Sequence, residues 1–282
     1  MALSSFRTQT EFAILPPARV AVSNIFQNVR TDRGRHDDLL AEMQRFRGRI
    51  YAGDGAIPAS ALTADGRHKV AADDHSWHVL SLDRDGRICA CLRYLEETRA
   101  AGFDDLLVRH AAMAQSDRSL EFREAVEREM AQARQMNMGF GEVGGWAVAE
   151  QYRCTFEPLR IILATYGLLE LLGGCVGVAT ATFRHKSAMI LRRIGLAPLM
   201  SDGAALPPFF DPHYDCQMEL LRFDSRFPNP KYRDAVRELA ISLMSAPVIR
   251  RENVLTNLQG RFGGFDMPVA GPVAMSSLDH AA

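Results

Sequence analysis

The most constraining feature of the chain is an alternation of strand-like and helix-like apolar segments between residues 140 and 196. Residues 140–149, "FGEVGGWAVA", and 175–183, "CVGVATATF", are rich in residues that favour strands. Between them lies "FEPLRIILATYGLLELLGG", a long apolar helix that ends on a glycine pair, and a short helix follows at 185–196. Such an order predicts an α/β fold in which helices flank a mixed sheet.

The remaining segments extend the same architecture. We expect a hairpin at 75–97 around "DRDG" and a last strand at 214–223. Helical spacing of apolar residues predicts helices at 36–51, 103–117, 119–135 and 229–246. Residues 36–246 are therefore expected to form a single domain. Residues 1–35 are predicted to be weakly structured, and 247–282 to be a flexible extension.

Composition narrows the class of protein. The chain has 282 residues and a net charge of −1, so no global field recruits nucleic acid or a membrane surface. Its five cysteines include no CxxC pair, which favours a reduced, cytoplasmic protein without a metal site. We expect no secretory signal, because charged residues stand where its apolar segment should be, and the longest apolar run contains Glu170 and is too short to span a bilayer.

One carboxylate stands inside the apolar segment 140–149. A buried carboxylate has a raised pKa, which suits a general base that removes a proton from an amine nucleophile. Glu142 has such a setting, with glycine, valine and Trp146 around it. Alternatively, Glu142 only ends a strand in solvent.

Four segments together resemble the acyl-homoserine-lactone synthases and the related N-acyl amino acid synthases. "FGEVGGWAV" resembles their fourth-strand motif, and "GVATATFRHKSAMILRRIGL" resembles their fifth strand and the helix after it. "GRICACLRYLEE" is similar to their second hairpin strand, with Arg93 as its arginine, and "MQRFRGRIYAG" to their N-terminal helix, with Arg47. The resemblance covers residues 36–223 and implies a GNAT-like fold with splayed fourth and fifth strands.

The sequence departs from this family in two places. The family has Ser-Arg where this chain has Gly144-Gly145, so the role of that arginine is absent or relocated. The family's acidic pair before the hairpin matches only loosely, at Asp73 and Asp74.

The resemblance also implies the site. A thioester carbonyl would lie between the splayed strands and be polarised by a strand N–H near Val148, while Glu142 and Arg93 act in catalysis. The residues expected to contact the acceptor or the acyl chain are Arg47, Trp77, Trp146, Thr180 and Thr182. Most tryptophans belong to the core, which is the more common alternative for these two, and strand propensity alone explains the threonines.

The turn after the fourth-strand motif bears on the acyl donor. "AEQYRCTFEP" contains no glycine, so close backbone approach to the pyrophosphate of coenzyme A is disfavoured. We expect an acyl carrier protein instead, with Arg153 on the single phosphate of its pantetheine arm. A basic docking face would comprise Arg184, Lys186, Arg192 and Arg193. These arginines can equally be ordinary surface residues.

The leading hypothesis is an N-acyltransferase. It would move a fatty acyl group from carrier protein, or less readily from coenzyme A, to the amine of an amino acid or a similar small acceptor. The thioester is then a co-substrate, and no tightly bound cofactor is expected. The alternatives are an acyl-homoserine-lactone synthase and a GNAT-like domain that binds an acyl ligand without chemistry.

Overall fold

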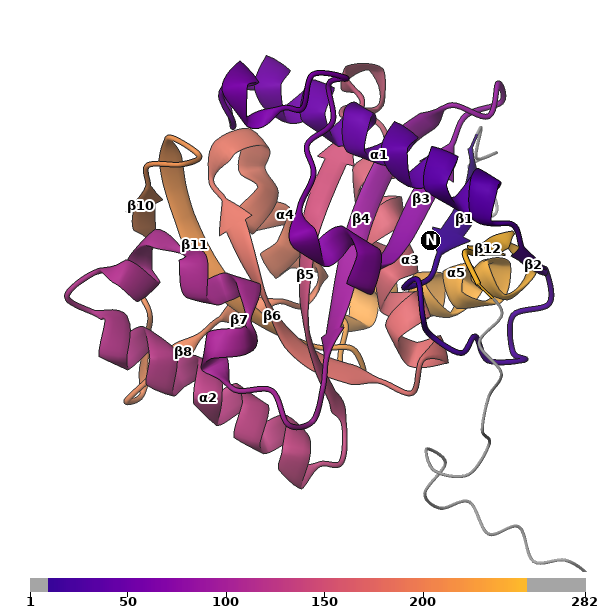
Figure 1. Cartoon of the computed structure of the whole chain (residues 1–282). Coiled ribbons are helices and arrows are strands. Elements are labelled where there is room, and N and C mark those ends of the chain that lie inside the picture. The colour runs from indigo at the N-terminus through magenta and orange to yellow at the C-terminus, as the bar shows by residue number, and fades with distance from the viewer. Residues whose placement is uncertain (1–9, 253–282) are drawn as a thin grey trace, which may run out of the picture.

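The computed structural model describes residues 10–252 of the chain, in which helices cover both faces of one large sheet (Figure 1). The strands lie in the order β10-β11-β6-β5-β4-β3-β1-β12-β2. The central ones are β3 (Trp77–Leu82), β4 (Ile88–Glu97), β5 (Gly139–Val148), β6 (Cys175–Thr182) and β11 (Cys216–Asp224). β5 and β6 are parallel, whereas β3, β4 and β5 pair antiparallel, as do β6 and β11. The expected mixed sheet is therefore confirmed.

The sheet extends beyond the predicted domain limits at both ends. β1 (Glu11–Leu15) pairs with β3 and also runs parallel to β12 (Val248–Arg250), which in turn pairs with β2 (Val29–Thr31). The prediction that residues 1–35 are weakly structured is thus wrong for these strands, and the domain does not end at residue 246. Strands of three to five residues carry too little periodicity to be recognised, and their partners are remote in sequence. Residues 1–9 and 253–282 lie outside the described part of the chain.

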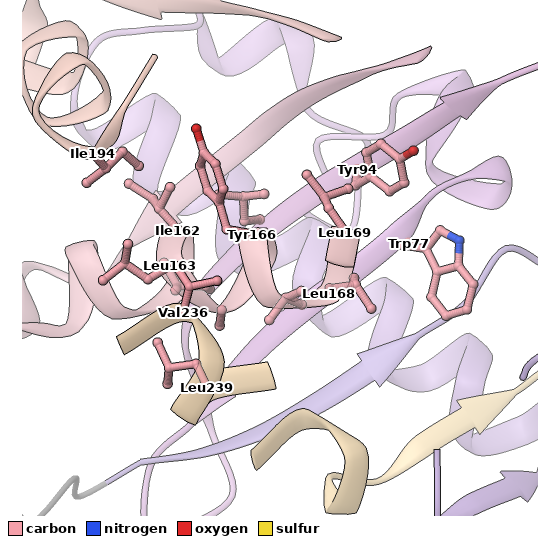
Figure 2. Packing of buried hydrophobic residues seen from close by; sticks show 14 of the residues in the cluster. Trp77, Tyr94, Ile162, Leu163, Tyr166, Leu168, Leu169, Ile194, Val236 and Leu239 are labelled. Atoms are coloured by element: carbon pink, nitrogen blue, oxygen red, sulfur yellow. The ribbon is translucent and has the colours of Figure 1, made fainter. Parts of the chain in front are cut away.

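Each face of the sheet has its own helices. α1 (Arg33–Gly53) and α2 (Ser119–Gln135) lie in front of the sheet in Figure 1, and α3 (Glu157–Leu171) and α5 (Arg233–Ser245) lie behind it. The largest buried cluster lies under α3 and α5 and includes residues of α4 (Ser187–Ile194), as Figure 2 shows for Ile162, Leu163, Ile194 and Val236. α3 is apolar on nearly every side because the sheet and α5 enclose it.

The segment between β4 and α2 is not the predicted helix. It forms three short 3-10 turns, Phe103–Asp105, Leu107–His110 and Ala112–Gln115. Their apolar residues pack against the N-terminal part of α2 and against β6 and β10 (Phe209–Asp211). Apolar spacing in this segment therefore reflects burial under α2 rather than a continuous helix. Three short strands follow α4. β7 (Ala197–Pro198) pairs with β11, and β8 (Met200–Ser201) pairs with β9 (Ala204–Ala205).

β5 and β6 separate halfway along their length. Their parallel pairing runs from Gly139 opposite Cys175 to Glu142 opposite Val178 and stops there. Beyond that point β5 stays paired with β4 as far as Val148, and β6 stays paired with β11 as far as Thr182. The result is a wedge-shaped gap with its vertex at Glu142, which confirms the predicted splay of these two strands.

A bulge marks β5 just beyond this vertex. Arg93 pairs with Gly144 and Cys91 with Ala147, so two residues of β5 face a single residue of β4. Gly145, in the bulge, has a φ of 66°, a conformation that glycine adopts without steric cost. The Tyr51 hydroxyl donates to the Trp146 carbonyl at 3.2 Å and ties the bulge to the end of α1.

Candidate active site

Glu142 lies at the vertex of the gap, on the face that α1 and α2 cover. Its two carboxylate oxygens accept backbone N–H groups from Leu107 and Val108, at 2.6 and 2.8 Å. Burial raises the pKa of Glu142, although these two hydrogen bonds and the charge of Arg93 act in the opposite direction. The prediction that Glu142 is buried is confirmed, because only 7% of the residue is exposed. Its role as a base stays a prediction.

A second carboxyl group lies near Glu142. Glu97 faces Phe140 across the β4–β5 ladder, two residues from the pairing of Leu95 with Glu142. Burial raises the pKa of Glu97 to about 7, and the charges of Glu142 and Asp105 contribute. This residue was not singled out from the sequence, because a glutamate at the end of a strand is usually solvated.

Asp73 organises a buried ionic cluster beside the vertex. Its carboxylate accepts both terminal nitrogens of Arg47, at 3.0 and 2.7 Å, the Gln44 amide at 3.0 Å and the Val70 N–H at 3.1 Å. Burial alone would raise the pKa of Asp73, but the hydrogen bond and charge of Arg47 outweigh it and lower the pKa to about 2. Arg47 is thus committed to a structural ion pair, with a further bond to the His68 carbonyl at 2.5 Å.

Arg93 carries the surplus charge of this cluster. Its nearest carboxylate contact is Asp73 at 3.7 Å, and within residues 10–252 its buried Nε has no hydrogen-bond partner. Burial and the adjacent Arg47 lower the pKa of Arg93, which shows that the site disfavours a second unpaired cation. The neighbouring His68 and His78 are neutral at pH 7, since burial lowers the pKa of each to about 4.

The bulge glycines lie directly against the two arginines. A Cβ atom on Gly145 would stand 3.3 Å from both Arg47 Nη1 and Arg93 Cβ, and one on Gly144 would stand 3.5 Å from Arg93 Nη2. The backbone of the two glycines therefore lies directly against the guanidinium groups. At Gly144-Gly145, where the resemblance expects Ser-Arg, the space that side chains would fill is occupied by Arg47 from α1 and Arg93 from β4.

The bulge also shifts the alternation of side chains along β5 by one residue, so residues after it face the opposite side of the sheet from the one that regular alternation would give. Glu142 faces α1 and α2, whereas Val143, Trp146 and Val148 all contact the cluster under α3. Trp146 is half-buried there, and its indole nitrogen is buried without a hydrogen-bond partner among the described residues. It therefore lies on the opposite face of the sheet from Glu142. Trp77 is 2% exposed and stacks on Phe26 with ring centroids 6.1 Å apart, so it belongs to the core, two strands away from the gap.

Val148 lies at the open end of the gap. The Ala149 N–H donates to the Cys89 carbonyl at 2.8 Å, and antiparallel alternation then turns the Val148 N–H away from β4, toward the gap. At about 3.3 Å per residue, the stretch from Glu142 to Val148 spans roughly 20 Å. Glu142 and the Val148 N–H therefore cannot act on one reacting carbon.

Charged residues from three segments meet at the mouth of the gap. Arg153 follows β5 and donates from Nη2 to the Asp54 carboxylate at 2.8 Å and from Nε to the Val148 carbonyl at 3.3 Å. Arg184 follows β6 and donates to the Asp54 carbonyl at 2.7 Å, while His185 Nε2 lies 3.4 Å from the Asp54 carboxylate. Asp54, at the end of α1, was not recognised from the sequence, because "AGDGA" reads as an ordinary turn.

The rest of the predicted basic face is divided. Arg192 makes a two-pronged ion pair with Glu219, whose side chain is only 3% exposed. Lys186 and Arg193 are exposed. Thr180 is exposed and Thr182 is half-buried, and both lie on the part of β6 that has separated from β5.

Comparison with known proteins agrees with this geometry. The structure of BjaI, a CoA-dependent acyl-homoserine lactone synthase, with MTA aligns with a TM-score of 0.50 at 13% identity, covering 86% of this chain and 92% of that one. The fold is that of the acyl-homoserine lactone synthases. At this identity the likeness establishes the GNAT-like fold and no more.

Two further structures are similar. MesI, a CoA-dependent acyl-homoserine lactone synthase, aligns with a TM-score of 0.49 at 15% identity, covering 84% of this chain and 98% of that one. FeeM, an N-acyl amino acid synthase from uncultured soil microbes, aligns with a TM-score of 0.44 at 11% identity, covering 77% and 92%. No protein-family model and no curated protein matches the sequence.

Residues 10–252 contain no group of three or more histidine, cysteine or acidic side chains arranged to hold a metal ion. None of their helices combines the length and apolar character that crossing a bilayer requires.

Proposed function

We propose that the protein is an N-acyltransferase that moves a fatty acyl group from a thioester to the amine of an amino acid or a similar acceptor. The observation that carries this proposal is the buried carboxylate of Glu142 at the vertex of the gap between β5 and β6. A thioester arm can lie in such a gap as an added strand, because no strand of residues 10–252 pairs with β5 on that side.

The reaction gives Glu142 one task. An amino group with an ordinary pKa near 7.7–8 is mostly protonated at neutral pH, so a base must remove a proton before or during attack. The amine nitrogen then bonds to the carbonyl carbon, the carbon–sulfur bond breaks, and the donor leaves as its thiol. A raised pKa suits Glu142 to this proton transfer.

The geometry supports moving the polarising N–H from Val148 to the bulge. Gly145 and Trp146 are the two β5 residues that share one partner on β4, and they are close in sequence to Glu142. With the carbonyl there, an extended pantetheine arm can run along β5 toward Arg153 at the mouth. Val148 would then pair with an amide of the arm through its N–H.

The acceptor is expected to carry a carboxylate. Arg93 is a buried cation whose Nε has no hydrogen-bond partner in the described part of the chain, and its guanidinium lies against the bare backbone of Gly144. Asp73 binds Arg47 more closely than Arg93, so a carboxylate on the acceptor would supply a counter-charge to Arg93. Amino acids should therefore be better acceptors than their amides, and Arg93→Gln should remove that preference.

The donor is proposed to be an acyl carrier protein. The glycine-free turn after β5 supports a single phosphate over a pyrophosphate, although BjaI, which has the same fold, is CoA-dependent. Assays with one acyl chain on carrier protein and on coenzyme A compare kcat/KM directly. Equal efficiency would exclude a carrier preference. A cytoplasmic location stays a prediction from the sequence.

A lactone synthase is the second candidate, favoured by the fold match to BjaI. The two functions differ in the acceptor and in the product. The purified protein, an acyl carrier donor and either an amino-acid panel or S-adenosylmethionine should be incubated and analysed by mass spectrometry. N-acyl amino acids support the first function and acyl-homoserine lactones the second. Bound fatty acid without a product from either acceptor would support the non-catalytic alternative.

A further inference from the structure

We propose that Asp54 acts as a carboxylate latch on a phosphate site that Arg153, Arg184 and His185 form across the mouth of the gap. The phosphate of the donor's arm and the Asp54 carboxylate compete for Arg153 and His185, and Arg184 lies beside them on the Asp54 carbonyl. This inference rests on the proposed function for the identity of the arm, but it concerns a binding step that can be measured without turnover.

The latch joins the two strands where they are furthest apart. Arg153 belongs to the turn after β5, and Arg184 and His185 belong to the turn after β6. All three converge on Asp54, which accepts Arg153 and approaches His185 through one carboxylate oxygen and accepts Arg184 through its carbonyl. The end of α1 thus lies against the turns that follow β5 and β6.

These contacts are accessible to solvent. The side chains of Asp54, Arg153 and His185 are 19%, 27% and 51% exposed, in contrast to the 2% of Asp73 in the inner cluster. Ion pairs at such positions contribute little to stability and exchange readily. The phosphodiester that joins a pantetheine arm to a carrier protein carries one charge and two free acceptor oxygens, so it can replace a single carboxylate on two donors.

The backbone holds the cations in place for this exchange. His185 and Lys186 have φ values of 54° and 61°, a left-handed conformation that is costly for residues with side chains. Gly55 has a φ of 66° and ends α1 so that Asp54 faces the gap. A Cβ atom on Gly55 would stand 3.7 Å from Arg184 Nη1, so this turn packs closely on the arginine.

The consequence differs between donors with and without a phosphate. A thioester whose arm ends in a phosphate displaces the Asp54 carboxylate and gains its partners in exchange. A short thioester that lacks phosphate gains nothing from the displacement. Asp54 therefore lowers the affinity for every phosphate-bearing donor by a fixed factor and leaves the affinity for donors without phosphate unchanged.

Binding of 4′-phosphopantetheine tests the latch directly, with pantetheine as the probe that lacks phosphate. By calorimetry on the full chain, Asp54→Asn should tighten phosphopantetheine binding about three- to tenfold and leave pantetheine binding unchanged. Arg153→Ala should weaken phosphopantetheine binding roughly ten- to a hundredfold, as expected for loss of a charged hydrogen bond. In the Arg153→Ala background, Asp54→Asn should have little further effect, because one cation of the site is gone.

Asp215→Asn is the matched control. This substitution removes the same charge from a nearby residue. Arg184 contacts Asp215 through the backbone carbonyl and not through the side chain, so phosphopantetheine binding should not change. Unchanged or weaker phosphopantetheine binding by Asp54→Asn, or an equal gain from Asp215→Asn, would overturn the latch. These binding outcomes are independent of acyl transfer: a protein that shows the latch yet forms no N-acyl product would refute the proposed function alone.

Discussion

The two ends of the gap between β5 and β6 hold similar residues in opposite settings. At the vertex, Asp73 binds Arg47 beneath the bulge, and both are almost completely buried. At the mouth, Asp54 binds Arg153 in partial contact with solvent. Both ends contain an aspartate that bridges arginines, yet only the inner pair must stay paired for the fold to persist. The comparison teaches that burial, rather than residue type, separates a fixed scaffold from an exchangeable contact.

The largest expected effect is on catalysis at the vertex. Glu142→Gln should lower kcat by roughly 10²- to 10⁴-fold, the usual contribution of a general base. The wild-type kcat/KM should rise with pH along a limb whose pKa lies above the ordinary value of about 4.3 for glutamate, because burial disfavours the carboxylate. That limb should be absent from the variant. Glu124→Gln, an exposed residue of α2, is the control, and wild-type turnover by Glu142→Gln would show that the base lies elsewhere.

The second prediction compares the two aspartates directly. Asp73→Asn leaves Arg47 buried without its paired carboxylate and should cost about 3–5 kcal/mol of unfolding free energy, whereas Asp54→Asn should cost about 0–1 kcal/mol. Denaturant titration of both variants measures the difference. Similar losses from the two would break the distinction between vertex and mouth.

Low pH should destabilise the fold by protonating Asp73 at the vertex. The folded pKa of Asp73 is about 2, below the ordinary value of about 3.9. Its contribution to stability is therefore complete above about pH 4 and is lost as the pH falls toward 2. Asp73→Asn should remove this part of the acid dependence of unfolding.

The third prediction concerns the bulge. Gly145→Ala forces a side chain into a left-handed conformation, at about 1–2 kcal/mol, and also presses on Arg47 and Arg93. Gly86→Ala is the matched control, since Gly86 has a φ of 75° but no neighbour among residues 10–252 within 4 Å of an added Cβ atom. Thermal unfolding should show the larger loss for Gly145→Ala, and only this variant should raise KM for the acceptor. Equal effects would mean that the arginines adjust freely.

The smallest effect is expected outside the mouth. The Lys186→Ala, Arg193→Ala double variant should slow association with an acidic carrier protein by at most roughly tenfold at low salt, and hardly at all at 0.5 M salt. Arg192 is unsuitable for this test, because its loss would strand the buried carboxylate of Glu219. Stopped-flow association at two salt concentrations gives the comparison, and a salt-independent loss would point to a direct contact instead.

Much of the fold followed from local pattern. The hairpin, α2, β5, α3 and β6 were predicted because each is long enough to show its period and ends on a recognisable turn or glycine pair. β1, β2 and β12 were missed because three to five residues show no period, and their pairing depends on segments more than two hundred residues apart. The turns at 103–115 were mistaken for a helix, because burial under α2 spaces apolar residues in the same way.

The sequence by itself determined the α/β class and the strand–helix–strand unit and indicated an apolar setting for Glu142, since hydrophobic period and turn chemistry are local properties of a chain. Only the tertiary structure decided where the charges act. It placed Arg47 on Asp73 and left Arg93 with the surplus charge, put Trp146 on the opposite face from Glu142 through a bulge, and brought Asp54 from the end of α1 onto Arg153 and Arg184. Ion pairs depend on distance and burial in space, and neither quantity can be read from residue spacing along the chain.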